Sequence, residues 1–126
     1  MKYKLITPID IKPRPTEDEQ SAAIILAEYF KSNVEFVKRG SSTTPDIKIG
    51  NIYWEIKSPR GNSKYTIMNN IHSAKHQSVN IVINLSRTKI TSRQAVSRAK
   101  ETLRDSPHGV KRLLIITKHN SIIDIK

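Results

Sequence analysis

Residues 44–57, which read TPDIKIGNIYWEIK, decide the fold of this chain. Two short runs with apolar residues at alternate positions flank the Gly-Asn pair at 50–51, and this pattern predicts a β-hairpin. Because side chains alternate along a strand, Tyr53, Glu55 and Lys57 should share one face of the second strand. The opposite face is apolar and consists of Ile52, Trp54 and Ile56. The hairpin therefore places a carboxylate and an ammonium side by side.

Asp46, at the start of the first run, adds a second acid to this pair. Pairing across the hairpin can bring Asp46 close to Glu55. Two carboxylates beside a lysine can hold a hard divalent cation and stabilise charge on a transferring phosphate. The same short pattern also occurs by chance in charged proteins, as a surface hairpin with a solvated cross-strand ion pair. The rest of the chain decides between these interpretations.

Length and composition indicate one globular domain. The chain has 126 residues, of which 37% are hydrophobic and 6% aromatic, so one modest core can form. It has no cysteine, which excludes disulfides and thiolate metal sites. The sequence has no apolar run of membrane-spanning length, and its N-terminus lacks the apolar segment of a signal peptide.

The charge is strongly unbalanced, with 22 Lys and Arg against 11 Asp and Glu, for a net charge of +11. Such a protein attracts polyanions at long range. Nucleic acid is the first candidate partner, an anionic membrane surface the second and an acidic protein the third. Alternatively, the charge only keeps the protein soluble.

The chain divides into a lead-in segment, residues 1–15, and a single domain, residues 16–126. Pro8, Pro13 and Pro15 exclude a regular helix from the lead-in. Thr16 and Glu19 form a capping-box pattern, which predicts the start of a helix over 17–31. Its buried stripe has the spacing of a helix and consists of Ala22, Ala23, Leu26, Ala27 and Phe30.

Periodicity and breakers predict the remaining elements in turn. After a strand over 34–38 and the hairpin over 46–57, we expect a helix over 63–77, a strand over 79–85, a helix from 91 or 92 to 104, and strands over 110–117 and 122–125. The order is αβββαβαββ. It predicts an α/β (α+β) fold with a central mixed sheet flanked by helices.

Pro45, Asp46, Glu55 and Lys57 together resemble the motif of the PD-(D/E)XK nuclease superfamily. The αβββαβ order of residues 16–85 is also the core order of that fold. The resemblance implies that Asp46 and Glu55 bind a divalent metal, most commonly Mg²⁺, with Mn²⁺ or Zn²⁺ as alternatives. It also implies that Lys57 helps to activate water or to neutralise the transition state.

The resemblance suggests two further site residues. The superfamily often supplies an acid from its first helix, and Glu19 fits this position, with Glu28 and Glu35 as alternatives. The capping box explains Glu19 equally well. Gln77 looks like an auxiliary site residue of several branches, although an exposed helix end would have the same sequence.

Substrate contacts are expected next to Lys57. Tyr53 is the aromatic residue on the same face and could stack on a base. The segment that follows the lysine could hold phosphate through Ser58, Arg60, Asn62 and Lys64, and a solvated loop would look the same. His72 and His76, one helical turn apart, are more typical of a solvated helix face than of a metal pair.

Residues 45–59 and 81–85, with Gln77 and the helix start at 19–27, resemble the C-terminal toxin domains of bacterial contact-dependent growth-inhibition and related polymorphic toxin systems. Many such domains are tRNA nucleases. The resemblance implies a domain that is secreted as part of a larger toxin, acts in the cytoplasm of the target cell and is neutralised by an acidic immunity protein. If Met1 is a native start, a stand-alone cytoplasmic nuclease is the alternative. A DNA endonuclease of the same fold and a non-catalytic nucleic-acid-binding module also remain open.

Overall fold

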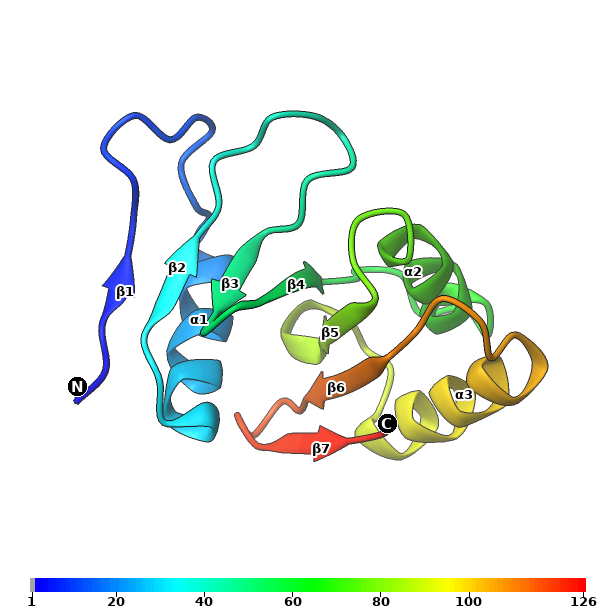
Figure 1. Ribbon diagram of the computed structural model, residues 1–126. Coiled ribbons are helices and arrows are strands. Elements are labelled where there is room, and N and C mark those ends of the chain that lie inside the picture. Colours follow the sequence, from blue (N-terminus) through cyan, green and yellow to red (C-terminus); the bar gives the residue numbers. More distant parts are fainter. Residues whose placement is uncertain (1) are drawn as a thin grey trace.

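The computed structural model describes residues 2–126, so Met1 lies outside the described part (Figure 1). One mixed sheet carries seven strands in the spatial order of the sequence. The strands are β1 (Leu5–Ile6), β2 (Val34–Phe36), β3 (Ile47–Ile49), β4 (Ile52–Lys57), β5 (Asn80–Asn84), β6 (Arg112–Ile116) and β7 (Ile122–Asp124). The helices are α1 (Glu17–Phe30), α2 (Thr66–Ala74) and α3 (Ser92–Asp105), with a 3₁₀ turn η1 (Leu85–Arg87).

The predicted hairpin is the antiparallel pair β3–β4, in which Ile47 lies opposite Trp54 and Ile49 opposite Ile52. Gly50, in the turn, has φ of 61°, a left-handed conformation that favours glycine. Strands β4, β5 and β6 then run parallel, and the crossovers between them contain α2 and α3. The predicted mixed sheet with flanking helices is therefore confirmed.

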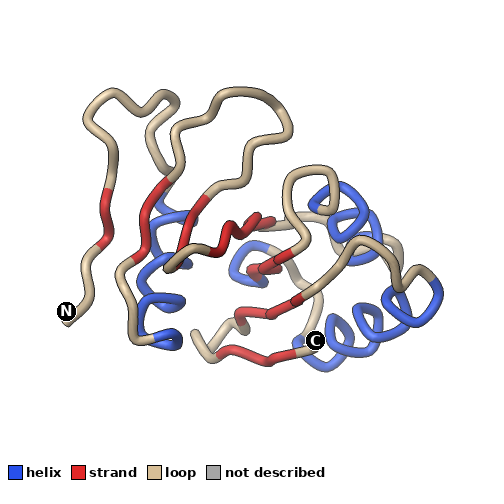
Figure 2. The backbone as a smooth tube through the Cα atoms, viewed as in Figure 1, coloured by secondary structure: helices blue, strands red, loops and turns tan. Residues whose placement is uncertain are grey.

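The two faces of the sheet are buried in separate cores. Strand β5 shows this directly, because Val82 packs with α1 while Ile81 and Ile83 pack with α2 and α3. Trp54 lies in the first of these cores and is 1% exposed. Figure 2 shows α1 on one side of the strands and α2 with α3 on the other. All residues of β5 are buried, as expected for a strand covered on both faces.

Two helices begin where the capping residues predict. Thr16 accepts a hydrogen bond from the Glu19 backbone N–H, and the Glu19 side chain accepts one in return. Thr91 and Gln94 form the same reciprocal pair at the start of α3. Satisfying two orphan N–H groups in this way fixes each helix start. The start of α1 matters most, since it lies beside the candidate site described below.

The sequence did not predict β1 or η1. Within the lead-in segment, β1 pairs in parallel with β2, and Ile11 is 5% exposed against the α1 core. Two residues are too few to show a strand period, and the pairing depends on tertiary contact. Helix α2 is also shorter than expected, because residues 63–65 and 75–77 form turns at its ends. Among residues 2–126, no helix combines the length and apolar character needed to cross a bilayer.

Candidate functional site

An open cavity of about 270 Å³ lies beside the second half of β4. It is bounded by the first turn of α1, the start of β3, the end of β4 and the turn after α2. The lining residues are Thr16, Asp18, Glu19, Arg39, Asp46, Glu55, Ile56, Lys57, Ser58 and Gln77. The cavity thus contains the whole acid–acid–lysine pattern, with Glu19, Ser58 and Gln77 as well.

Asp46 is held by backbone pairing on both sides. Its N–H donates to the Trp54 carbonyl at 3.1 Å, and its carbonyl accepts from the Val37 N–H at 3.0 Å. The carboxylate accepts from the Ile56 N–H through Oδ2 at 2.9 Å and from the Arg39 guanidinium through Oδ1 at 3.2 Å. The side chain is 6% exposed. Asp46 is therefore fixed in direction, with both oxygens engaged.

Glu55 is buried, at 2% exposure, and is held less completely than Asp46. Its Oε2 lies 3.3 Å from the Lys57 ammonium, whereas Oε1 is buried with no hydrogen-bond partner. Burial and the negative charge of Asp46 raise the pKa of Glu55 to about 8, and Lys57 only partly offsets them. An unpaired buried carboxylate oxygen costs free energy, so the site favours a proton or a cation at this position.

Lys57 bridges Glu55 and the segment that follows α2. Its ammonium lies 2.8 Å from the side-chain oxygen of Gln77, to which it donates. Gln77 follows the end of α2, and its N–H donates to the Ala74 carbonyl at 2.9 Å. The side chain of Lys57 is 22% exposed, so the ammonium is fixed and still accessible from the cavity.

Glu19 serves the helix cap and also lines the cavity. Its Oε1 accepts from the Thr16 N–H at 3.3 Å and from the Thr16 hydroxyl at 3.1 Å. The two interpretations of this residue are therefore compatible. Beside it, Asp18 forms an ion pair with Arg87 of η1, which joins the first turn of α1 to the segment after β5.

The chemistry of the donor set fits a hard divalent cation. Asp46 and Glu55 are close enough to interact electrostatically, and Glu55 Oε1 has no other partner. Within residues 2–126, no cluster of three or more His, Cys, Asp or Glu could hold a metal. A cation here would take two carboxylates from the protein and its other ligands from water or phosphate, as Mg²⁺ commonly does.

Other expected substrate residues lie outside this cavity. Tyr53 shares the strand but is 45% exposed, and the Lys48 ammonium lies 5.7 Å from the centre of its ring. Arg60, Asn62 and Lys64 are exposed on the segment that leads to α2. Ser58 and Gln77 are the two expected substrate residues that line the cavity.

The alternative acids lie elsewhere. Glu28 lines a separate hollow between α1 and the β6–β7 turn, and Glu35 is exposed on β2 opposite Lys48. The sequence had not indicated Arg39 or Asp18. Arg39 lies in a Ser- and Thr-rich loop, and only the folded chain brings its guanidinium onto Asp46. No local pattern could have revealed that contact.

The fold and the cavity define a class: a small, basic α/β domain with two buried acids and a lysine converging on a central strand. Residues 43–122 match the family "Contact-dependent growth inhibition CdiA C-terminal domain". The match extends from the loop before β3 into β7, more than half of the chain. The chain belongs to this family, and it is accordingly a toxin domain of contact-dependent growth inhibition.

A solved structure supports the same fold. The "CdiA-CT/CdiI toxin and immunity complex from Burkholderia pseudomallei" superposes with a TM-score of 0.69, at 22% identity and with 98% of each chain covered. That coverage includes β1 and α1, which precede the family match. No curated protein matches this sequence.

Proposed function

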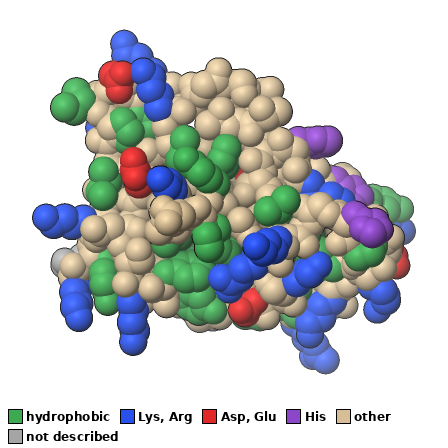
Figure 3. All heavy atoms as spheres, in the orientation of Figure 1, with side chains coloured by type: hydrophobic (Ala, Val, Ile, Leu, Met, Phe, Trp, Pro, Cys, Tyr) green, Lys and Arg blue, Asp and Glu red, His purple; other side chains and the backbone are tan. Residues whose placement is uncertain are grey.

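We propose that this toxin domain is a metal-dependent ribonuclease with tRNA as its favoured substrate. The main support for this proposal is that Asp46, Glu55 and Lys57 line one cavity, in a protein with a net charge of +11. The motif residues, their strand positions and the helix α1 beside them fit the PD-(D/E)XK resemblance. Figure 3 displays blue Lys and Arg side chains around much of the visible outline and few red acids, which suits a polyanionic substrate.

Asp46 and Glu55 would hold the metal, and a bound Mg²⁺ supplies Lewis-acid stabilisation of the phosphate and a lowered pKa for water. Lys57 carries a fixed positive charge beside them, suited to orienting the attacking water or to neutralising charge on the phosphate. Gln77 holds the lysine ammonium in position. Arg39 orients Asp46 through its contact with Oδ1.

Two alternatives use the same fold: a DNA endonuclease and a non-catalytic nucleic-acid-binding module. Incubating the pure domain with total RNA or with plasmid DNA, each with Mg²⁺ or EDTA, separates all three. We expect RNA to be cut in Mg²⁺ and not in EDTA. Cleavage of plasmid alone supports the DNA enzyme, and binding without cleavage of either supports the module.

We further propose that an acidic immunity protein neutralises the domain. The solved structure of similar fold is described as a complex of toxin and immunity protein. A basic surface around two carboxylates suits an acidic protein that covers Lys57 and residues 60–64, where charge would chiefly accelerate capture. An inhibitor bound elsewhere could instead exclude the tRNA by its bulk. The domain would be secreted on a larger protein and act in the cytoplasm of the target cell.

Expression in bacteria tests the toxin activity. The wild-type domain alone should arrest growth, Asp46→Ala should relieve the arrest, and co-expression of an acidic neighbouring reading frame should restore growth. Wild-type domain that accumulates to a high level without a growth defect would favour the binding module.

A further inference from the structure

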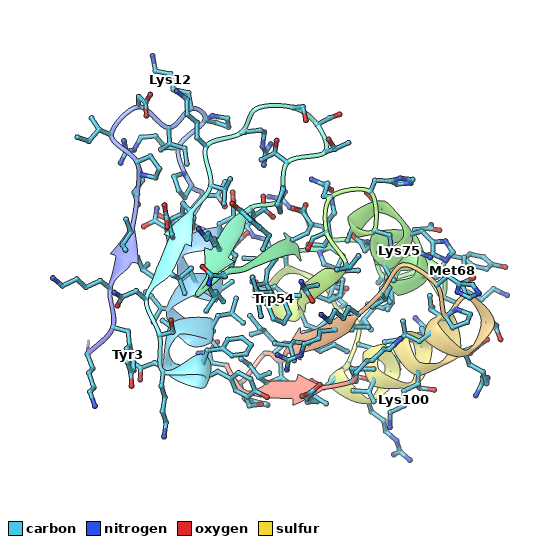
Figure 4. All side chains as sticks on the ribbon, viewed as in Figure 1. Tyr3, Lys12, Trp54, Met68, Lys75 and Lys100 are labelled. Atoms are coloured by element: carbon cyan, nitrogen blue, oxygen red, sulfur yellow. The ribbon has the colours of Figure 1, made fainter. Side chains whose placement is uncertain are left out.

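A second cavity, of about 290 Å³, lies between α2 and α3 and is separate from the acid–acid–lysine site. One face of α2, with the two residues before the helix, supplies one wall, and the second half of α3 supplies the other. Its lining residues are Lys64, Tyr65, Met68, His72, Arg98, Glu101, Thr102, Asp105 and Ser106. Figure 4 shows Met68 on α2, facing the part of the molecule where α3 approaches it. A cavity of this size holds about one nucleotide.

One wall offers an aromatic face with positive charge. Tyr65 is 53% exposed, and the Lys64 ammonium lies 5.1 Å from the centre of its ring. An exposed tyrosine beside a lysine suits a base stacked on the ring and a phosphate at the ammonium. Tyr29 and Tyr53 are also exposed, at 43% and 45%, but of the three only Tyr65 lines this cavity.

The opposite wall carries two acids on one helical face. Glu101 and Asp105 are four residues apart, and like charges at this spacing destabilise a helix. Glu101 has no ion-pair partner among the described residues. Asp105 has only Arg104, at 4.0 Å, and the side chains of Arg104 and Asp105 are 72% and 70% exposed. Lys64, His72 and Arg98 line the same cavity, so its charge is mixed, and Glu101 is the acid left to accept hydrogen bonds from a ligand.

The segment between the two cavities is braced. The Thr88 hydroxyl donates to the Gly61 carbonyl at 2.6 Å, and Arg98 donates to the Ser63 carbonyl at 3.1 Å. The Ser63 N–H in turn donates to the Thr66 hydroxyl at 3.1 Å. Residues 58–65 therefore hold the second cavity at a fixed position relative to Lys57. A strand bound at Lys57 and a base bound at Tyr65 would have a defined separation.

We propose that this cavity binds one unpaired guanosine of the RNA substrate. The ring would stack on Tyr65, and the two adjacent N–H donors of its Watson–Crick edge would be accepted by the Glu101 carboxylate on α3. Guanine is favoured because it alone has two donors side by side on that edge, N1–H and the N2 amino group, whereas adenine, cytosine and uracil each have one donor group there. The proposal rests on the ribonuclease function in one respect only, that the ligand is part of an RNA.

Nucleotide titrations in EDTA test the cavity without any cleavage. Guanosine, adenosine, cytidine and uridine 5′-monophosphates are added to ¹⁵N-labelled domain, and dissociation constants are taken from amide shifts. GMP should perturb Tyr65, His72 and Arg98 and bind more tightly than the other three. Loss of a charge-assisted hydrogen bond should weaken GMP binding roughly tenfold in Glu101→Gln, and Tyr65→Ala should weaken it similarly.

Matched variants and a second readout complete the test. Glu28→Gln and Tyr29→Ala alter exposed residues of α1 and should leave GMP binding unchanged. Equal affinity for all four nucleotides, or shifts confined to the surroundings of Lys57, would overturn the proposal. If GMP binds here but no RNA is ever cut, the cavity assignment stands and the ribonuclease function fails. If RNA is cut and GMP leaves α2 and α3 unperturbed, the reverse holds.

Discussion

The ammonium of Lys57 donates a hydrogen bond to the side-chain oxygen of Gln77 at 2.8 Å, and its other contact is Glu55 Oε2 at 3.3 Å. The glutamine lies in the turn after α2, so a helix on one face of the sheet positions a lysine on its central strand. A flexible lysine side chain loses rotamer freedom when it is held in one place. Gln77 therefore orients the lysine before any substrate arrives.

Gln77→Leu removes this acceptor at nearly constant volume. We expect kcat for RNA cleavage to fall about tenfold, as a 1.4 kcal/mol loss of positioning would give, with a smaller change in KM. His76→Ala, at the exposed neighbouring position, is the control and should behave as wild type. Steady-state kinetics on one RNA substrate measures both. If kcat is unchanged in Gln77→Leu, the contact between Gln77 and Lys57 contributes to the structure but not to catalysis.

Asp46→Asn removes the charge of the first acid together with its contact to the exposed Arg39, because the amide nitrogen cannot accept a hydrogen bond. An asparagine oxygen can still accept from the Ile56 N–H, so the melting temperature should change little. Loss of the negative charge, like the separate change Lys57→Ala, should reduce cleavage by roughly 10²-fold or more. Circular dichroism and a cleavage assay on the same samples give the two readouts. Asp10→Asn, which removes an exposed acid paired with Lys38, should retain full activity.

The pKa of Glu55 predicts how stability depends on pH in EDTA. It is about 8 in the folded protein, against an ordinary value of 4.5. Between these values the folded state holds a proton that the unfolded state has lost, so stability falls as the pH rises from 4.5 to 8. The decline should not exceed roughly 1.4 kcal/mol per pH unit. Above pH 8 both states are ionised and the loss is complete.

Glu55→Gln removes this titration and should flatten the decline. Urea unfolding at pH 5 and pH 8 measures the effect, and the variant should gain stability relative to wild type chiefly at pH 8. Glu35→Gln, an exposed acid on β2, is the matched control. An equal slope in wild type and Glu55→Gln would show that Glu55 is not the titrating group.

The hairpin and its acids were predictable because the information is local. Alternation gave Glu55 and Lys57 a common face, and the turn at 50–51 set the register that places Asp46 next to Glu55. The helix starts at Thr16 and Thr91 were predictable for the same reason, since capping residues act within one turn.

Contacts between distant segments were not predictable in this way. Arg39 on Asp46, Arg87 on Asp18 and the pairing of β1 with β2 each depend on how whole elements pack. Tyr53 shows a further limit: alternation places it on the face of Glu55, but it lies too early on β4 to line the cavity. The period of a strand gives the face, whereas the position along the strand depends on where the neighbouring segments end.

The salt dependence of RNA binding measures how many phosphates the basic surface neutralises. Each contact should add about 0.7 to the slope of log K against log salt for single strands and about 0.9 for duplex. Several contacts are expected for a net charge of +11. Arg60→Ala and Lys64→Ala change exposed cations on the segment that follows Lys57, and each should reduce the slope by about one contact. Titrations in EDTA, from low to physiological salt, keep the RNA intact.

Lys31→Gln is the control, because Lys31 caps the far end of α1, about 20 Å along the helix from Glu19. It should leave the slope unchanged. If Lys31→Gln lowers the slope as much as Arg60→Ala does, RNA binding depends on the overall charge of the protein and not on contacts with the segment beside Lys57. A nearly flat dependence in the wild-type domain would exclude phosphate contacts as the main source of binding.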